Sequence, residues 1–233
     1  MPTSIAKLGK RGRPETKGPE LDLLTKAVSN GLLRKKGFCR AVFYEPRMPT
    51  GYPDLIVAFY AKPAARMSCV RKTLSTSHIR LAHQIYCSKG AKIEELARLL
   101  GLRNTLARAL IEDLVAAGLA IRRGDFVRTK PIKKIFPVRQ IISVECKVGS
   151  WRRAIRQALG NTWFASESYI LLPQTKAISA ITKEAQRVGI GVMFFDGHKT
   201  RKALSAVRHH QPASYGSWMV NEWVVAGLGW GNT

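Results

Sequence analysis

The chain has 233 residues, of which 45% are hydrophobic, so it can bury a core and form one large or two small domains. Lys and Arg number 39 against 15 Asp and Glu, which gives a formal net charge of +24. This excess predicts a polyanionic partner, and nucleic acid is the first candidate. Because no apolar run reaches the length of a membrane span and the N-terminus lacks a signal-peptide core, we expect a cytoplasmic protein that is nucleoid- or DNA-associated and has no membrane partner.

The first segment, residues 1–18, carries basic residues among Gly and Pro with almost nothing apolar to pack, which predicts a flexible basic arm. Within it, Lys10-Arg11-Gly12-Arg13-Pro14 resembles the core of an AT-hook. That resemblance implies that Arg11 and Arg13 lie in the narrow minor groove of A·T-rich DNA. The alternative is a solvated tail that adds non-specific attraction to phosphates.

A helix is expected over 19–33, with Pro at its first turn and apolar residues at helical spacing. Two strands follow, at 39–45 and 54–60, separated by a region rich in Pro and Gly. After Pro137 the pattern resumes with strands at 138–147, 168–172 and 190–195, alternating with helices at 150–160 and 176–187. An apolar segment at 218–226 is expected to close over the core.

The residues between the expected strands at 54–60 and 138–147 have a different pattern. The pattern predicts helices at 77–88, 92–100 and 104–117 and then two short strands around 123–125. Residues 70–134 contain 14 basic and five acidic side chains. The helix-turn-helix followed by a hairpin resembles a winged-helix domain, with the third helix as its recognition helix.

That resemblance implies a set of DNA contacts. Asn104 would cap the recognition helix, and the hairpin would contact the DNA backbone or the minor groove. The expected DNA-binding residues are Arg103, Asn104, Thr105, Arg108, Arg122 and Arg123. The alternative is a module that docks another protein.

Strands that alternate with helices predict an α/β fold with a mixed central sheet flanked by helices and with the winged-helix domain inserted into it. The expected divisions are a flexible basic arm at 1–18, a core in two parts at 19–69 and 135–233, and the inserted domain at 70–134.

Two short strings carry acidic residues at the ends of buried strands. Asp54 opens the strand in Gly51-Tyr52-Pro53-Asp54, and Glu145-Cys146-Lys147 closes a strand far downstream. Because side chains alternate along a strand, Glu145 and Lys147 share a face and Cys146 points to the other, with its carbonyl available to a metal. Carboxylates that hold Mg²⁺ (or Mn²⁺) next to a positively charged side chain are the groups that a metal-dependent phosphodiesterase uses.

These strings resemble the motifs of the PD-(D/E)XK nuclease superfamily, whose core is restriction-endonuclease-like. The resemblance implies a catalytic Asp54, Glu145 and Lys147, with metal held by Asp54, Glu145 and the Cys146 carbonyl. It also implies a Gln157 that faces the site from the next helix and a Glu20 from the helix before the first strand. Asp54 and Glu145 lie 91 positions apart, farther than in the family, and excluding 70–134 restores a short connection.

The function expected from these features is a Mg²⁺-dependent DNA endonuclease that acts on double-stranded DNA, as a homodimer if it cuts both strands. One alternative is a non-catalytic DNA-binding transcriptional regulator on a nuclease-like scaffold. Another is a structure-selective, Holliday-junction-type resolvase. A further alternative is that the two acidic strings have only a structural role, because Pro-Asp is a common turn dipeptide and Glu-x-Lys can be a solvated ion pair on an edge strand.

Overall fold

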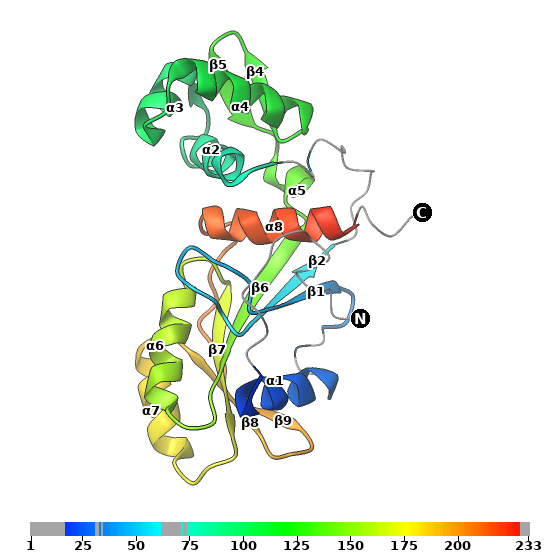
Figure 1. Cartoon of the computed structure of the whole chain (residues 1–233), viewed down its shortest axis with the longest axis vertical. Helices are drawn as coiled ribbons and strands as arrows, with labels where there is room; N and C mark the ends of the chain where they lie inside the picture. Colours follow the sequence, from blue (N-terminus) through cyan, green and yellow to red (C-terminus); the bar gives the residue numbers. More distant parts are fainter. Residues whose placement is uncertain (1–16, 31–32, 34, 62–70, 72–73, 229–233) are drawn as a thin grey trace. The chain divides into compact units, whose positions relative to one another are not determined.

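The computed structural model describes residues 17–30, 33, 35–61, 71 and 74–228, and they divide into two units (Figure 1). The first unit comprises Met1–Tyr60 and Val138–Gly216. The second unit comprises Ala61–Pro137 and Ser217–Thr233. The expected basic arm, including Arg11 and Arg13, lies almost entirely outside the described residues.

The first unit is built on a sheet of six strands in the order β1-β2-β6-β7-β8-β9. Pairing is antiparallel from β1 through β2 to β6, parallel from β6 through β7 to β8, and antiparallel again between β8 and β9. The strands are β1 (Cys39–Tyr44), β2 (Leu55–Tyr60), β6 (Val138–Cys146), β7 (Glu167–Pro173), β8 (Gly191–Phe195) and β9 (Thr200–Leu204). The mixed sheet confirms the expected α/β class.

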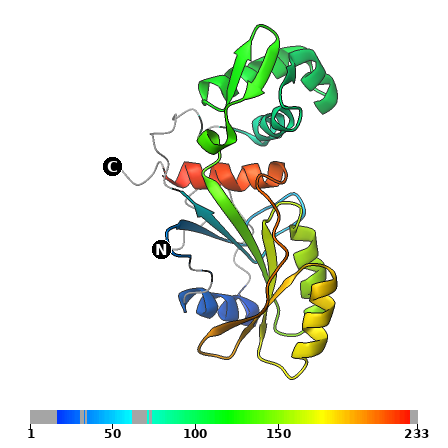
Figure 2. The same cartoon turned by 180° about the vertical axis from the view of Figure 1, so that it is seen from behind.

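Helices cover both faces of this sheet (Figure 2). On one face α1 (Pro19–Ser29) packs Leu24 and Ala27 onto apolar side chains of the strands. On the other face α6 (Trp151–Asn161) and α7 (Ile178–Arg187) pack against the alternate residues of β7 and β8. Because β2, β7 and β8 are buried on both faces, β2, β8 and residues 169–172 of β7 are continuously apolar rather than alternating.

The described part of the second unit begins with three helices and a small sheet. In chain order these are α2 (Thr76–Cys87), β3 (Ala91–Lys92), α3 (Ile93–Leu100), α4 (Asn104–Ala116), β4 (Ala120–Arg123) and β5 (Phe126–Thr129). The strands pair antiparallel in the order β3-β5-β4. A short α5 (Ile132–Ile135) follows, and α8 (Tyr215–Leu228) contributes to the same unit from the end of the chain.

The chain leaves and re-enters the first sheet at neighbouring points. Tyr60 at the end of β2 is paired with Val138 at the start of β6. One residue farther on, the Ala61 N–H donates a hydrogen bond of 3.2 Å to the Pro137 carbonyl. The long segment between them is therefore an insertion between two adjacent antiparallel strands.

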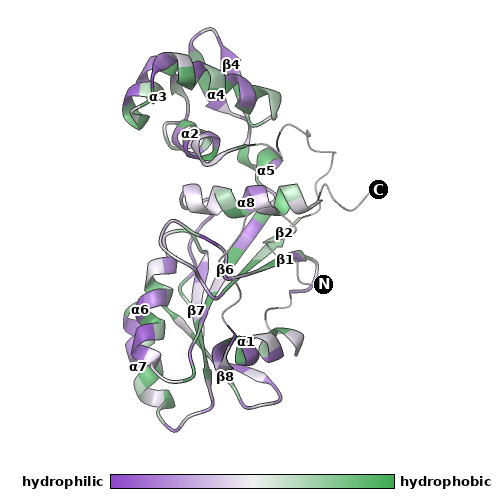
Figure 3. Cartoon of the chain, viewed as in Figure 1, coloured by the Kyte–Doolittle hydropathy of each residue, from purple (hydrophilic) through white to green (hydrophobic). Residues whose placement is uncertain are grey.

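Several details differ from the expectations. The first helix ends at Ser29 and not at residue 33. Asn104 is the first residue of α4 rather than its cap. The strands β3 and β9 and the helix α5 were not expected. The apolar segment near the C-terminus lies in the helix α8, which mixes hydrophobic residues with pale and hydrophilic ones (Figure 3). From Ser217 this helix groups with the second unit rather than with the core. No helix within the described residues is long and apolar enough to span a membrane.

Candidate active site

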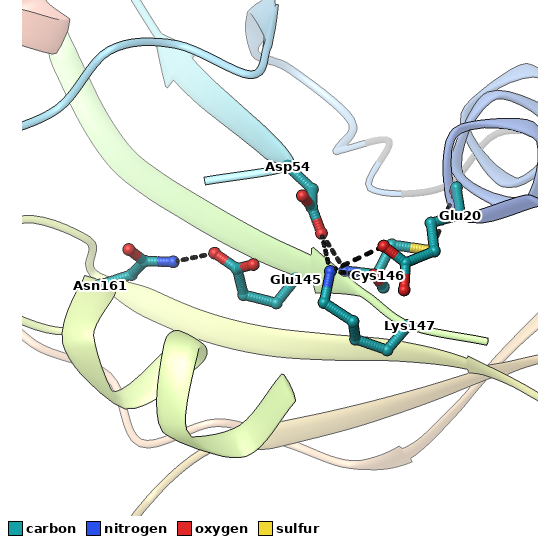
Figure 4. A network of polar contacts seen from close by, with 6 residues as sticks. All are labelled: Glu20, Asp54, Glu145, Cys146, Lys147 and Asn161. Atoms are coloured by element: carbon teal, nitrogen blue, oxygen red, sulfur yellow. Dashed lines mark hydrogen bonds and ion pairs between the residues drawn. The ribbon is translucent and has the colours of Figure 1, made fainter. Parts of the chain in front are cut away.

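The antiparallel register of β2 and β6 brings the two acidic strings together. Leu55 is paired with Val144, so Asp54, just before β2, lies beside the end of β6. Asp54 Oδ2 accepts a hydrogen bond of 2.7 Å from the Cys146 N–H (Figure 4). Burial raises the pKa of Asp54, although Lys147 and the Cys146 N–H act in the opposite direction. The backbone contact fixes this carboxylate against β6.

Lys147 lies just beyond β6 and bridges two carboxylates. Its Nζ donates to Glu20 Oε2 at 3.0 Å, to Asp54 Oδ2 at 3.2 Å and to its neighbour's carbonyl, Cys146 O, at 2.8 Å. Burial alone would lower the pKa of Lys147, but the charges of Asp54 and Glu20 outweigh it and raise the pKa. The ammonium group is therefore protonated at neutral pH. Glu20 comes from the first turn of α1, as expected.

Glu145 points toward α6, whereas the Lys147 ammonium contacts Glu20 of α1. The expectation that the two side chains share a face was therefore wrong, because Lys147 lies just beyond the end of β6 and does not continue its alternation. Glu145 Oε1 accepts a hydrogen bond of 2.7 Å from Asn161 Nδ2, and Glu145 is only 2% exposed. Its other oxygen, Oε2, is buried without a hydrogen-bond partner. Burial, reinforced by the charge of Asp54, raises the pKa of Glu145 to about 8, although Asn161 and Lys147 oppose the shift.

A cavity of about 470 Å³ opens beside these residues. Glu20, Asp54, Lys147 and Gln157 all line it, so four of the five expected catalytic residues share one space. Glu145, the fifth, is not among the lining residues and lies buried next to Asp54. Gln157 Oε1 is buried without a hydrogen-bond partner.

The expected metal ligands are close together but are not arranged as a finished metal site. Among the described residues, no three His, Cys, Asp or Glu side chains form a group that could hold a metal ion. Two contacts account for this: the Lys147 ammonium lies between Glu20 and Asp54, and Glu145 is turned toward Asn161. The Cys146 carbonyl accepts its hydrogen bond from Lys147.

Three residues of this region were missed from the sequence. Asn161 is one turn beyond Gln157 on α6, at the spacing that places both on one helix face. Glu45 and Tyr52 belong to the connection between β1 and β2 and line the cavity. The helical spacing from Gln157 could have indicated Asn161, whereas nothing local in the sequence distinguishes Glu45 from other loop acids.

The expected DNA-binding residues of the second unit differ in their surroundings. Arg103, Asn104, Thr105 and Arg123 are exposed. Arg108 forms an ion pair with Asp125 at 2.8 Å, and Arg122 pairs with Glu112 and donates to the Gly124 carbonyl. These pairs join α4 to the β4-β5 hairpin, so neither arginine presents a fully unengaged guanidinium.

Comparison with known proteins gives no match: no family model, no curated protein and no solved structure is significantly similar to this chain.

Proposed function

We propose that this protein is a Mg²⁺-dependent DNA endonuclease of the PD-(D/E)XK type. The observation that carries the proposal is the contact of Lys147 with Asp54, with Glu145 buried next to Asp54, beside a cavity that Glu20 and Gln157 also line. Groups that perturb one another's pKa beside a cavity are typical of catalytic sites. A purely structural ion pair needs no cavity beside it.

The donor atoms present are of the type that a hard cation prefers, although Lys147 now engages two of them. Asp54, Glu145 and the Cys146 carbonyl offer oxygen donors, which Mg²⁺ and Mn²⁺ prefer. The buried Glu145 Oε2 lacks any hydrogen-bond partner, and a buried unpaired carboxylate oxygen is costly unless another group satisfies it. A bound Mg²⁺ would supply Lewis-acid stabilisation of the phosphoryl oxygens and would lower the pKa of an attacking water.

Lys147 is suited to stabilise charge rather than to remove a proton. Its two carboxylate partners keep it protonated, and a protonated ammonium group cannot act as a general base. When a phosphodiester enters, the same ammonium can donate to a phosphate oxygen and offset the negative charge that develops there. Gln157 can donate from its amide to the water or to the phosphate.

The second unit supplies a duplex-binding surface in this proposal. Its element order, three helices and the sheet order β3-β5-β4 support the winged-helix interpretation, in which α4 enters the major groove. Arg103, the N-cap of α4, and the first two residues of the helix, Asn104 and Thr105, are exposed. When DNA binds, Arg108 would exchange its ion pair with Asp125 for a phosphate contact. Arg122 would do the same with its ion pair to Glu112.

A direct assay tests this function. The full-length protein is incubated with supercoiled, linear and four-way-branched DNA in Mg²⁺, in Mn²⁺ and in EDTA. We expect cleavage with either metal and none with EDTA. Metal-independent DNA binding without cleavage of any substrate would instead favour a non-catalytic DNA-binding regulator, and cleavage of branched DNA alone would favour a resolvase.

A further inference from the structure

The cavity extends beyond the carboxylates to a set of side chains that the cleavage chemistry leaves unused. Tyr52 and Val148 line it and are 38% and 46% exposed. Arg153 and Lys17, both exposed, add two cations to the same lining. At about 470 Å³ the cavity falls within the size range of small-molecule sites and exceeds the space that a metal ion and one phosphate need.

The loop that carries Tyr52 is held in place by hydrogen bonds. Met48 and Gly51 exchange two backbone bonds of 2.8 and 3.0 Å, and Gly51 adopts a φ of +132°, which favours glycine. Trp163 Nε1 donates to Thr50 Oγ1 at 3.0 Å, which ties the loop to the segment after α6. The ring of Tyr52 is therefore presented from a fixed turn, two residues before Asp54.

We infer that this cavity takes one unstacked nucleotide adjacent to the scissile phosphate, with its base on the ring of Tyr52 and its flanking phosphate at Arg153. This inference rests on the proposed nuclease function and names its substrate class: DNA with an unpaired base at the cleavage point. A base inside a duplex is stacked on both faces and cannot reach Tyr52 without being flipped out, which costs least where the base is already unpaired. Stacking on an aromatic side chain tolerates any base, so this subsite selects structure rather than sequence.

The test compares kcat/KM of the full-length protein on a duplex and on the same duplex with a single-stranded flap, both in Mg²⁺. Base stacking of the usual strength predicts that Tyr52→Ala lowers kcat/KM on the flap at least about fivefold more than on the duplex. Tyr52→Phe keeps the ring and should retain the wild-type preference. Phe38→Ala is the matched control, because Phe38 is also 38% exposed but does not line the cavity.

Equal losses on both substrates, or no loss with Tyr52→Ala, would overturn the nucleotide subsite while leaving the nuclease intact. If the wild-type protein cleaves neither substrate, the proposed function fails, and the subsite is then decided by affinity. In that case fluorescence anisotropy with the flap DNA in EDTA should show weaker binding for Tyr52→Ala than for Phe38→Ala. Equal affinities of these two variants would reject the subsite as well.

Discussion

At the scale of single residues, the site depends on how two carboxylates are held in different surroundings. Asp54 is fixed by a backbone N–H and the Lys147 ammonium, whereas Glu145 is buried with one oxygen on Asn161 and the other without a partner. Asn161 thus fixes the orientation of Glu145 and leaves Oε2 for another ligand. Residues that orient a metal ligand in this way contribute to metal affinity.

Replacing Asn161 should therefore weaken metal binding. We expect Asn161→Leu to lower the affinity for Mn²⁺ by about 10- to 100-fold, because Glu145 loses its orienting donor. Isothermal titration calorimetry of the full-length protein measures this. Asn30→Leu is the control, since Asn30 also donates a 2.7 Å bond, to the His198 carbonyl, but does not line the cavity. Similar Mn²⁺ affinities for the two variants would contradict a role for Asn161 in holding Glu145.

The raised pKa of Glu145 also predicts how stability depends on pH without metal. In the folded protein its pKa is about 8 against an ordinary value of 4.5, mainly because of burial. Between these values the folded state holds a proton that the unfolded state has lost, so stability falls as the pH rises through this window. The raised pKa of Lys147 acts only above 10.5 and leaves this window unchanged.

Glu145→Gln removes this titration. In urea unfolding with EDTA, we expect the wild-type protein to lose more unfolding free energy between pH 5 and pH 8.5 than Glu145→Gln loses. The histidines are common to both proteins and cancel in the comparison, whereas any change in the titration of Asp54 is part of the effect of Glu145, because the two carboxylates influence each other. Identical pH dependence would show that Glu145 is not buried as the structure describes.

At the scale of elements, the sequence predicts nearly every helix and strand that positions the site. Continuous apolar runs identify β2, β7 and β8, and helical spacing identifies α1, α6 and the three helices of the second unit. β9 was missed because Thr200–Leu204 is a charged, exposed edge strand whose Arg and Lys conceal any apolar alternation. The grouping of α8 was wrong because an apolar helix does not reveal which partner it packs against.

Within the second unit, a buried ion pair attaches α8 to the inserted segment. Arg71 Nε and Nη2 each donate to the Glu222 carboxylate at 2.7 Å, and Nη2 also donates to the Ile135 carbonyl. Asn221 donates to Glu222 and to the same carbonyl. Trp218 packs edge-to-face on Phe136 and Tyr86. Polar and aromatic contacts together therefore hold α8 to this unit.

Removing one partner of this ion pair should destabilise the second unit. Arg71→Met leaves Glu222 buried without its partner, so we expect the unfolding free energy of this unit to fall by about 3–5 kcal/mol. Urea titration followed by tryptophan fluorescence reports it, since Trp218 and Trp223 lie on α8. The double variant Arg71→Met/Glu222→Leu removes both charges and should recover part of the loss. A loss below about 1 kcal/mol in the single variant would argue that the pair is solvated.

At the scale of the whole molecule, the chain is a mixed α/β sheet interrupted between two adjacent strands by a basic unit. The sequence could predict the insertion because excluding 70–134 brings the two acidic strings to a short separation. It could not predict Asn161's bond to Glu145 or the bridging position of Lys147. These two contacts depend on side-chain rotamers that are set by packing in the folded protein and that no local sequence pattern indicates.

The neighbouring exit and entry points predict that the first unit folds without the insertion. A chain in which residues 62–136 are replaced by a short Gly-rich turn, and which ends at residue 214 so that α8 is also removed, should remain folded. Circular dichroism should show one cooperative melting transition, and duplex affinity should fall because the basic unit is absent. A non-cooperative melt would contradict the independence of the first unit.

The most direct test of the account is metal-dependent cleavage by the wild-type protein and Glu145→Gln, compared side by side on one labelled DNA. Gln keeps the size of Glu145 but removes the charge that would hold the cation. We expect cleavage by the wild-type protein in Mg²⁺, a loss of at least about 100-fold in the variant, and DNA affinity in EDTA that is the same for both. Equal cleavage by the two proteins would contradict the assignment of this site.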